Sequence, residues 1–204
     1  MKNKLSKLLV LSGLSKTQKG AFKSNGYYYR SGLRTTFKES LRYFAGGRVL
    51  DIGAGFGNEA KLLLKQGNEV VATDSNTEAV RHLRRLTKKY SKLDVLEESL
   101  PSLTAVGTFD LIVCEMVLHF LNRKDTLSSI KRMQAKTKAG GLNVISTYVD
   151  LAPLNQDESM KSYYKYLLPT GELKMLYDKW DIILYEEKSN LYSFKSARII
   201  ARKR

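Results

Sequence analysis

The chain has 204 residues and 43% hydrophobic composition, enough for one substantial core, so we expect one principal folded unit. A single cysteine, Cys114, excludes an internal disulfide and a cysteine-rich zinc site, and we expect no metal. The formal charge of +15 would favour anionic partners such as nucleic acid, although solvated helix faces explain a spread of lysine and arginine equally simply.

The amino-terminal stretch MKNKLSKLLVLSGLSK has only a short apolar patch, Leu8 to Leu11, before further lysines. No apolar run approaches the roughly 18 residues of a membrane span. These features predict a cytoplasmic chain without a membrane span. Residues 1–45 are interpreted as a basic, partly helical amino-terminal segment that acts as a lid, and residues 46–204 as the main domain.

Apolar runs then alternate with stretches of helical period. Strands are predicted at 48–52, 69–74, 93–96 and 109–114, and at 142–149. Helices are predicted over 57–64, from Asn76 through Tyr90, and over much of 125–137, where Gly140 and Gly141 are expected to stop the helix. A helix over 171–180 precedes two final strands, 181–188 and 194–203.

This alternation predicts a doubly wound α/β fold in which helices cover both faces of a mostly parallel, seven-stranded sheet. The last two strands are joined by only a few residues around Ser189 and Asn190. Such a connection is too short for a crossover helix, so the last strand should run antiparallel.

A glycine-rich stretch, VLDIGAGFGN, follows the first strand and contains Gly53, Gly55 and Gly57. In an open parallel sheet, ligands bind at the carboxyl ends of the strands, where a glycine turn lets the backbone approach them. Tight packing between strand and helix would also require glycine, so the turn alone leaves both interpretations open.

Asp74 ends the second strand, at the position where a carboxylate accepts hydrogen bonds from both ribose hydroxyls. A helix N-cap is the alternative role. A nicotinamide cofactor would favour G-x-G-x-x-G, whereas Asn58 occupies the place of the third glycine, and Asp51 would repel a pyrophosphate. S-adenosylmethionine has an ammonium, a sulfonium and a ribose but no phosphate, and it suits these charges.

VLDIGAGFG, Asp74, Glu97 and Glu98 before Leu100, and FDLIVCEMVLHFL resemble the successive motifs of class I S-adenosylmethionine-dependent methyltransferases, over roughly residues 46–204. Within that superfamily, FLNRKDTLSSIKRMQAKTKAGGLNVISTYV, GELKMLYDKWDIILYEE and ARIIARK resemble the tellurite-resistance methyltransferase (TehB-like) family. The resemblance implies a Rossmann-like fold and methyl transfer from S-adenosylmethionine, with S-adenosylhomocysteine as product.

The resemblance also implies roles for single residues. The backbone around Gly53 would flank the methionine moiety, Asp74 would bind the ribose, and the end of the FDLIVC strand would form the wall behind the sulfonium. Apart from the resemblance, the cluster Tyr27, Tyr28 and Tyr29 before the main domain is interpreted as a lid over the cofactor, with Arg30 pairing with the cofactor carboxylate. The expected cofactor-binding residues are Tyr28, Arg30, Asp51, Gly53, Ala54, Gly55, Asp74, Ser75, Glu97, Glu98, Cys114 and Glu115.

Methyl transfer from a sulfonium needs alignment rather than an obligatory nucleophile or metal, so motifs reveal little about the acceptor. His119 is a candidate general base and Tyr148 a candidate acceptor contact, and simple packing is the alternative for each. Tyr163, Tyr164 and Tyr166 are expected to contribute to the acceptor pocket.

The leading hypothesis is a methyltransferase with a small-molecule acceptor. The alternatives are an RNA or other nucleic-acid methyltransferase and a non-catalytic nucleoside-binding scaffold. CEMV stands where an Asn-Pro-Pro-Tyr-like run would mark methylation of exocyclic amines. The turn KSNLYSF lacks the histidine and arginine that the tellurite family carries there, so the resemblance does not establish tellurite or another chalcogen oxyanion as the substrate. The sequence does not indicate an oligomeric state.

Overall fold

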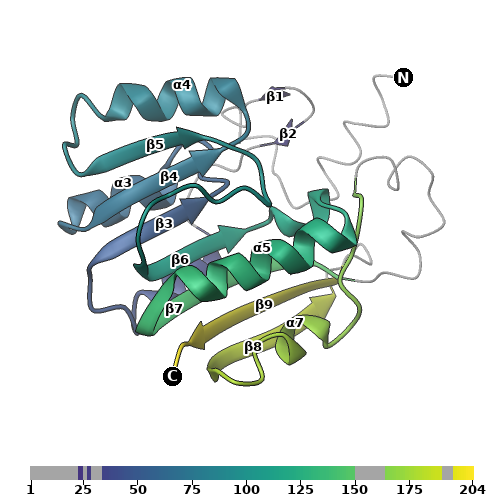
Figure 1. Cartoon of the computed structure of the whole chain (residues 1–204). Helices are drawn as coiled ribbons and strands as arrows, with labels where there is room; N and C mark the ends of the chain where they lie inside the picture. Colours follow the sequence, from purple (N-terminus) through teal and green to yellow (C-terminus); the bar gives the residue numbers. More distant parts are fainter. Residues whose placement is uncertain (1–22, 25–26, 29–33, 150–163, 190–194) are drawn as a thin grey trace, which may run out of the picture.

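The computed structural model describes residues 23–24, 27–28, 34–149, 164–189 and 195–204. Seven strands form one sheet in the order β5-β4-β3-β6-β7-β9-β8 (Figure 1). Their bounds, along the sheet, are β5 (Leu93–Glu97), β4 (Glu69–Asp74), β3 (Arg48–Ile52), β6 (Phe109–Glu115), β7 (Thr137–Tyr148), β9 (Lys195–Arg202) and β8 (Asp181–Ser189). β9 pairs antiparallel with both of its neighbours, and the other pairs are parallel. The predicted fold class, with its reversed last strand, is confirmed.

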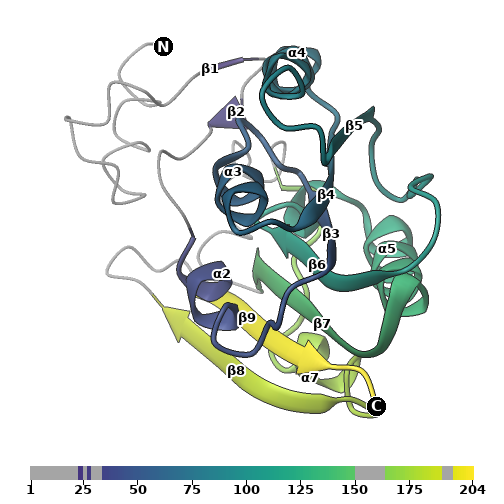
Figure 2. The ribbon, with the colours of Figure 1, turned by 90° about the vertical axis from the view of Figure 1, so that its left-hand side faces the viewer.

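Helices cover both faces of this sheet (Figure 2). The helices α2 (Thr35–Ser40), α3 (Asn58–Lys65) and α4 (Thr77–Leu86) contribute to one core, and α5 (Arg123–Lys136) and α7 (Glu172–Met175) contribute to the other. A 3-10 turn, η1 (Leu118–Phe120), follows β6, and a short antiparallel pair, β1 (Lys23–Ser24) and β2 (Tyr27–Tyr28), precedes the sheet.

Successive residues of the central strands point into opposite cores. In β3, for example, Val49 packs with Leu63 of α3, whereas Leu50 packs on the other face with Ile130 of α5. Phe37 of α2 is fully buried in the first core. α2 therefore packs with the sheet although it lies within the predicted segment 1–45, and the lid role of that segment stays a prediction.

Three predicted helix ends were wrong. α5 ends at Lys136 because Thr137 adopts an extended conformation and its hydroxyl donates to Met133 O. Gly140 and Gly141, expected to stop this helix, lie inside β7 instead.

α4 ends at Leu86 rather than continuing to Tyr90, and the hydroxyl of Thr87 at its C-cap donates to Arg84 O. α7 stops at Met175, and the rest of the predicted helix forms turns that bury Tyr177 and Trp180 against the sheet. In these two segments, apolar residues at helical spacing reach the core from turns, which is why the period overestimated the helices.

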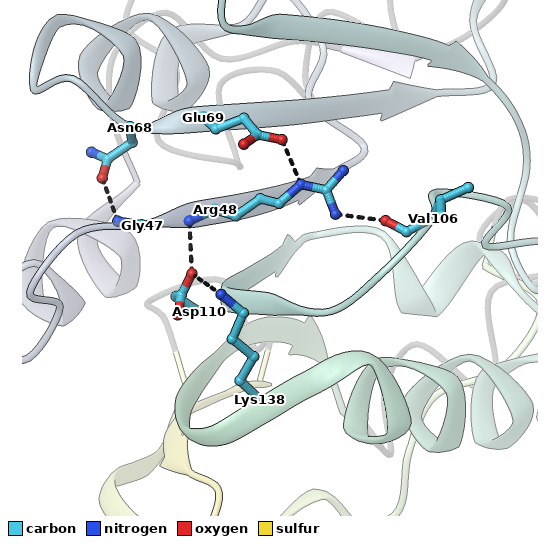
Figure 3. Close-up of polar contacts among 7 residues, drawn as sticks. All are labelled: Gly47, Arg48, Asn68, Glu69, Val106, Asp110 and Lys138. Carbon is cyan, nitrogen blue, oxygen red and sulfur yellow. Dashed lines mark hydrogen bonds and ion pairs between the residues drawn. The ribbon is translucent and has the colours of Figure 1, made fainter.

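Arg48 and Asp110 link the amino ends of β3 and β6 (Figure 3). Asp110 Oδ2 accepts from Arg48 N at 2.8 Å and from the Lys138 ammonium at 2.8 Å. The Arg48 guanidinium donates to Glu69 Oε1 at 2.5 Å and to Val106 O at 2.6 Å. The ionised groups at the amino ends of β3 and β6 therefore have partners, and hydrogen bonds link the two strands at these ends.

Gly57 caps α3 and has a structural reason to be glycine. Its φ is +71°, and a Cβ there would lie 2.7 Å from Leu83 Cδ2 of α4. Of the three glycines in the turn, Gly57 thus serves helix packing rather than a ligand.

Gly57→Ala is expected to destabilise the fold by about 2–4 kcal/mol, from left-handed backbone strain plus the contact with Leu83. Gly67→Ala is the matched control, since Gly67 has φ +88° and a Cβ added there would meet no atom within 4 Å. The control should cost only the strain, about 1–2 kcal/mol. Urea unfolding of both variants measures the difference, and equal losses would contradict the packing role of Gly57.

Candidate active site

A cavity of about 240 Å³ opens at the carboxyl ends of β3, β4 and β6. The strand order reverses between β3 and β6, so the cavity lies where open α/β sheets bind their ligands. Its walls are the ends of these strands, the segment after β5, and η1 with the residues that follow it; Arg34 and Lys165 also contribute.

Asp74 joins the glycine turn to the start of α4. Its Oδ2 accepts from Gly55 N at 2.8 Å, and its Oδ1 accepts from Asn76 N at 2.8 Å. Asn76, not Asp74, caps the helix, since its side chain accepts from the amides of Glu78 and Ala79. The capping alternative for Asp74 is thereby answered, and two backbone amides hold its carboxylate in a fixed orientation at the cavity wall.

Asp51 and Glu115 are acids buried at 3% and 4% exposure. Within the described part of the chain, Asp51 Oδ2 and Glu115 Oε2 have no hydrogen-bond partner. Burial raises the pKa of Asp51 well above its usual range, and the charge of Glu59 raises it further, whereas Arg34 lowers it. Burial likewise raises the pKa of Glu115, against an opposing effect of Arg34. The site thus gathers acidic groups out of contact with water, where their ionised form is costly in the absence of a cation.

Arg34 is the cation that these acids share. It lies at the cavity wall directly before α2, and its backbone N–H donates to Glu59 Oε1 at 3.0 Å. The sequence reasoning missed it and selected Arg30, four positions earlier. The only signal in the sequence was weak, an arginine directly before the short stretch TTFKES.

The adjacent acids Glu97 and Glu98 point in different directions. Glu98 lines the cavity, where its Oε2 accepts from the amide of Thr104 at 2.9 Å and from its hydroxyl at 2.8 Å. Its Oε1 is buried and has no partner among the residues described. Glu97 instead accepts from the Thr77 hydroxyl at 2.7 Å and lies 3.7 Å from the Arg84 guanidinium, so it serves α4.

The close approach at Gly53 comes partly from the protein itself. Gly53 lines the cavity with φ +67°, and a Cβ there would lie 2.4 Å from Val117 Cγ2. Met116, the neighbour of Val117, also has a positive φ of 61° and donates to Ser146 O at 2.7 Å. The segment after β6 is therefore pressed against the glycine turn.

Aromatic rings gather beyond this segment. The His119 ring lies 4.8 Å from that of Tyr148 and 5.0 Å from that of Tyr164, and Phe120, which lines the cavity, lies 4.3 Å from His119 between ring centroids. The backbone N–H of Tyr148 donates to His119 Nδ1 at 3.5 Å. Burial lowers the pKa of His119 to about 3, so the ring is neutral near pH 7, and Nδ1 as acceptor leaves its proton on Nε2.

Comparison with known proteins identifies the family. A family model described as "Tellurite resistance protein TehB" matches residues 18–196. The chain belongs to this family. Membership confirms the resemblance read from the sequence.

Individual relatives agree. A "Probable S-adenosyl-L-methionine-dependent methyltransferase TehB" of Haemophilus influenzae (strain 10810) is 29% identical over 170 residues, 77% of this chain and 57% of the relative. This chain thus spans little more than half the length of that relative. The crystal structure of TehB from Haemophilus influenzae superposes with a TM-score of 0.73 at 23% identity, covering 86% of this chain and 64% of that one.

A second solved structure shares the fold. It is the Burkholderia thailandensis 1,6-didemethyltoxoflavin-N1-methyltransferase with bound 1,6-didemethyltoxoflavin and S-adenosylhomocysteine, with a TM-score of 0.67, 18% identity, and coverage of 83% and 77%. Among the described residues of the present chain, no helix is long and apolar enough to cross a membrane, and no three His, Cys, Asp or Glu side chains gather as a metal-binding set.

The remaining predicted site residues lie in different places. Ser75 lines the cavity, whereas the Cys114 side chain is fully buried in the core, where burial raises the pKa of its thiol. Ala54 also packs in a core, and its N–H donates to Thr73 O. Arg30 and the side chain of Tyr28 lie outside the described residues.

The neutral state of His119 predicts acid lability. Between pH 6.5, the usual pKa of histidine, and about pH 3, the unfolded chain binds a proton at this residue that the folded chain does not, so stability is lost as pH falls. For each pH unit of acidification in that window, the protonation of His119 in the unfolded chain should lower the free energy of unfolding by up to about 1.4 kcal/mol. Denaturant unfolding from pH 7.5 to 4.5 measures the slope, which should be flatter in His119→Gln.

His82→Gln is the comparison variant. The pKa of His82 is also lowered by burial, but this side chain stays partly exposed, so the slope should change less. Identical slopes in wild type and His119→Gln would show that His119 is charged in the folded protein.

Proposed function

We propose that the chain is an S-adenosylmethionine-dependent methyltransferase that acts on a small-molecule acceptor. The observation that carries the proposal is a set of buried carboxylate oxygens, on Asp51, Glu98 and Glu115 around the switch point of the sheet, that have no hydrogen-bond partner in the described part of the chain. A buried acid without a partner is costly, so the site favours a ligand that brings cations and N–H donors. S-adenosylmethionine brings an ammonium, a sulfonium and an adenine amine, and the family relatives are named for its use.

The nucleoside half of the cofactor binds on the β4 and β5 side. Asp74, whose carboxylate is oriented by two backbone amides, binds the ribose hydroxyls. Glu98 lies beyond β5 with its Oε1 available to accept from the adenine amine. Ser75 lies between the two at the cavity wall.

The amino-acid half binds at the glycine turn. Asp51 faces the ammonium, and Arg34 pairs with the carboxylate, the task that the sequence analysis gave to Arg30. Residues Gly53 to Gly55 provide backbone along this part of the cofactor. Residues before Arg34, with Tyr28 and Arg30, keep their proposed role as a lid that closes over the site.

Catalysis is an in-line displacement. A lone pair of the acceptor attacks the methyl carbon, the carbon–sulfur bond breaks, and its electron pair stays on sulfur, which leaves neutral S-adenosylhomocysteine. The protein aligns the two reactants and excludes water.

The acceptor binds against Phe120, Tyr148 and Tyr164. His119, neutral and protonated on Nε2, is a weak base, and we propose that it packs against and orients the acceptor as a hydrogen-bond donor rather than removing a proton from it.

A small acceptor is favoured over nucleic acid by where the cations lie. The exposed cations of α4 and the turn after it are Arg81, Arg84, Arg85, Lys88 and Lys89. α4 begins beside the cavity at Asn76 and rises about 1.5 Å per residue, so these cations lie increasingly far from the reacting centre. A surface that binds the phosphate backbone of a nucleic acid would be expected to extend into the cavity, whereas these cations lie progressively farther from it.

Asp74→Ala should raise the Kd for S-adenosylmethionine by about 10- to 100-fold, the scale of a lost hydrogen bond to a charged group. Glu97→Gln is the matched control, because Glu97 pairs with Asp74 across β5 and β4 but its side chain contacts α4. The Kd of this variant for S-adenosylmethionine should be unchanged. Calorimetric titration measures both. Equal affinities in wild type and Asp74→Ala would contradict the ribose assignment.

The acceptor class can be tested without knowing the acceptor. Incubation of the protein with methyl-labelled S-adenosylmethionine and a cell extract should place label in the dialysable, low-molecular-weight fraction. Label in RNA that persists after protein removal would instead establish the nucleic-acid alternative.

A further inference from the structure

Two buried acids face each other from the two central strands of the switch point. Asp51 belongs to β3 and Glu115 ends β6, and the pairing of Ile52 with Cys114 brings the ends of these strands side by side. Each has one carboxylate oxygen without a partner among the described residues. Arg34 is the cation that lowers the pKa of both acids. The proposed function assigns Arg34 to the carboxylate of the cofactor, and this leaves Asp51 and Glu115 to be matched by cations of the ligand.

The presence of two such acids matches a difference between the substrate and product forms of the proposed cofactor. The inference therefore rests on the proposed function. S-adenosylmethionine carries two cationic centres, the ammonium and the sulfonium. S-adenosylhomocysteine keeps only the ammonium. Asp51 is assigned to the ammonium, which both forms share, so the second acid is matched by a charge that only the substrate form has.

Glu115 lies where the sulfonium must be. It lines the cavity at the end of β6, directly before Met116 and Val117, which press on the glycine turn, and the aromatic wall at Phe120 follows. The methyl group has to lie between the cofactor, held at the glycine turn, and the acceptor, held at that wall. Of the four acids that line the cavity in the described part of the chain, Asp74 and Glu98 lie on the β4 and β5 side, and Asp125 lies in the first turn of α5, beyond Phe120. Glu115, at the end of β6, is the one that lies between these two regions.

We propose that Glu115 is a specificity-determining residue that makes the site prefer the sulfonium form of the cofactor over the demethylated product. While the cofactor carries its methyl group, the carboxylate and the sulfonium form a buried ion pair. Methyl transfer moves the carbon–sulfur electron pair onto sulfur and removes that charge. Glu115 is then left buried beside a neutral thioether, which weakens product binding and promotes its release.

A purely structural role for Glu115 makes a different prediction. Hydrogen bonds from Thr36 and Ser146 lower the pKa of Glu115, so its carboxylate also helps to hold α2 near the sheet. If that were its whole contribution, its loss would weaken both forms of the cofactor equally. The ratio of the two affinities therefore separates the roles.

Proton uptake offers a second readout that needs no variant. The charged groups that interact with Glu115 are Arg34 before α2, Glu59 from α3 and Asp51 from β3. Burial, the largest influence, raises the pKa of Glu115 in the free protein. A sulfonium beside it lowers that pKa again, so S-adenosylmethionine should displace more protons than S-adenosylhomocysteine does, most clearly at a pH where Glu115 is partly protonated in the free protein.

The experiment is calorimetric titration of wild type, Glu115→Gln and Glu98→Gln with S-adenosylmethionine, S-adenosylhomocysteine and sinefungin, in which a protonated amine replaces the methylsulfonium. Glu115→Gln should weaken the two cationic ligands by about tenfold or more and S-adenosylhomocysteine by less than about twofold. Glu98→Gln, at the adenine end that all three share, should weaken them equally. Glu115→Asp keeps the charge and should restore most of the preference.

Repeating the wild-type titrations in buffers of different ionisation enthalpy gives the protons released, even if Glu115→Gln fails to fold. An equal loss for all three ligands in Glu115→Gln, or equal proton release by substrate and product forms, would overturn the inference and leave the methyltransferase assignment intact. Absence of binding by all three ligands to wild type would overturn the proposed function itself.

Discussion

Asp51, Glu98 and Glu115 each hold one buried carboxylate oxygen that has no hydrogen-bond partner among the described residues, and the proposed function depends on this constraint. Burial raises the pKa of both Asp51 and Glu115, and Arg34 only partly offsets the effect. A fold stabilised by a few kcal/mol tolerates such groups where a ligand compensates them. The proposed cationic nucleoside completes the electrostatics of the site, and this explains why buried acids gather at the carboxyl ends of the two central strands, at or beside the cavity.

The two ends of the central strands differ in whether the protein supplies partners for the carboxylates there. At the amino ends of β3 and β6, the Asp110 carboxylate meets the backbone of Arg48 and the ammonium of Lys138 (Figure 3). At the carboxyl ends of the same strands, Asp51 and Glu115 each retain an oxygen without a partner among the described residues. At the amino ends, the protein itself supplies the partners of the carboxylate. At the carboxyl ends, in the proposed function, the cofactor supplies them.

The class of sheet, its reversed last strand and the place of the cavity followed from patterns in the sequence, because apolar runs and glycine turns are local signals. The direction in which a side chain points could not be predicted from a local signal, because it depends on how the strands pair. Glu97 and Glu98 are adjacent and look alike in sequence, yet pairing of β5 with β4 directs the first toward α4 and leaves the second at the cavity. Arg34 was missed because its importance comes from acids 17 to 81 positions later that only the folded sheet brings to it.

The central claim, that the unpartnered acids receive a cationic nucleoside, is tested most directly by a crystal structure of the protein soaked with S-adenosylmethionine. The account predicts the adenine amine within hydrogen-bond distance of Glu98 Oε1, the ribose hydroxyls on Asp74, and the ammonium at Asp51. A nucleoside bound elsewhere, or these carboxylates turned away from it and paired with one another, would contradict the account.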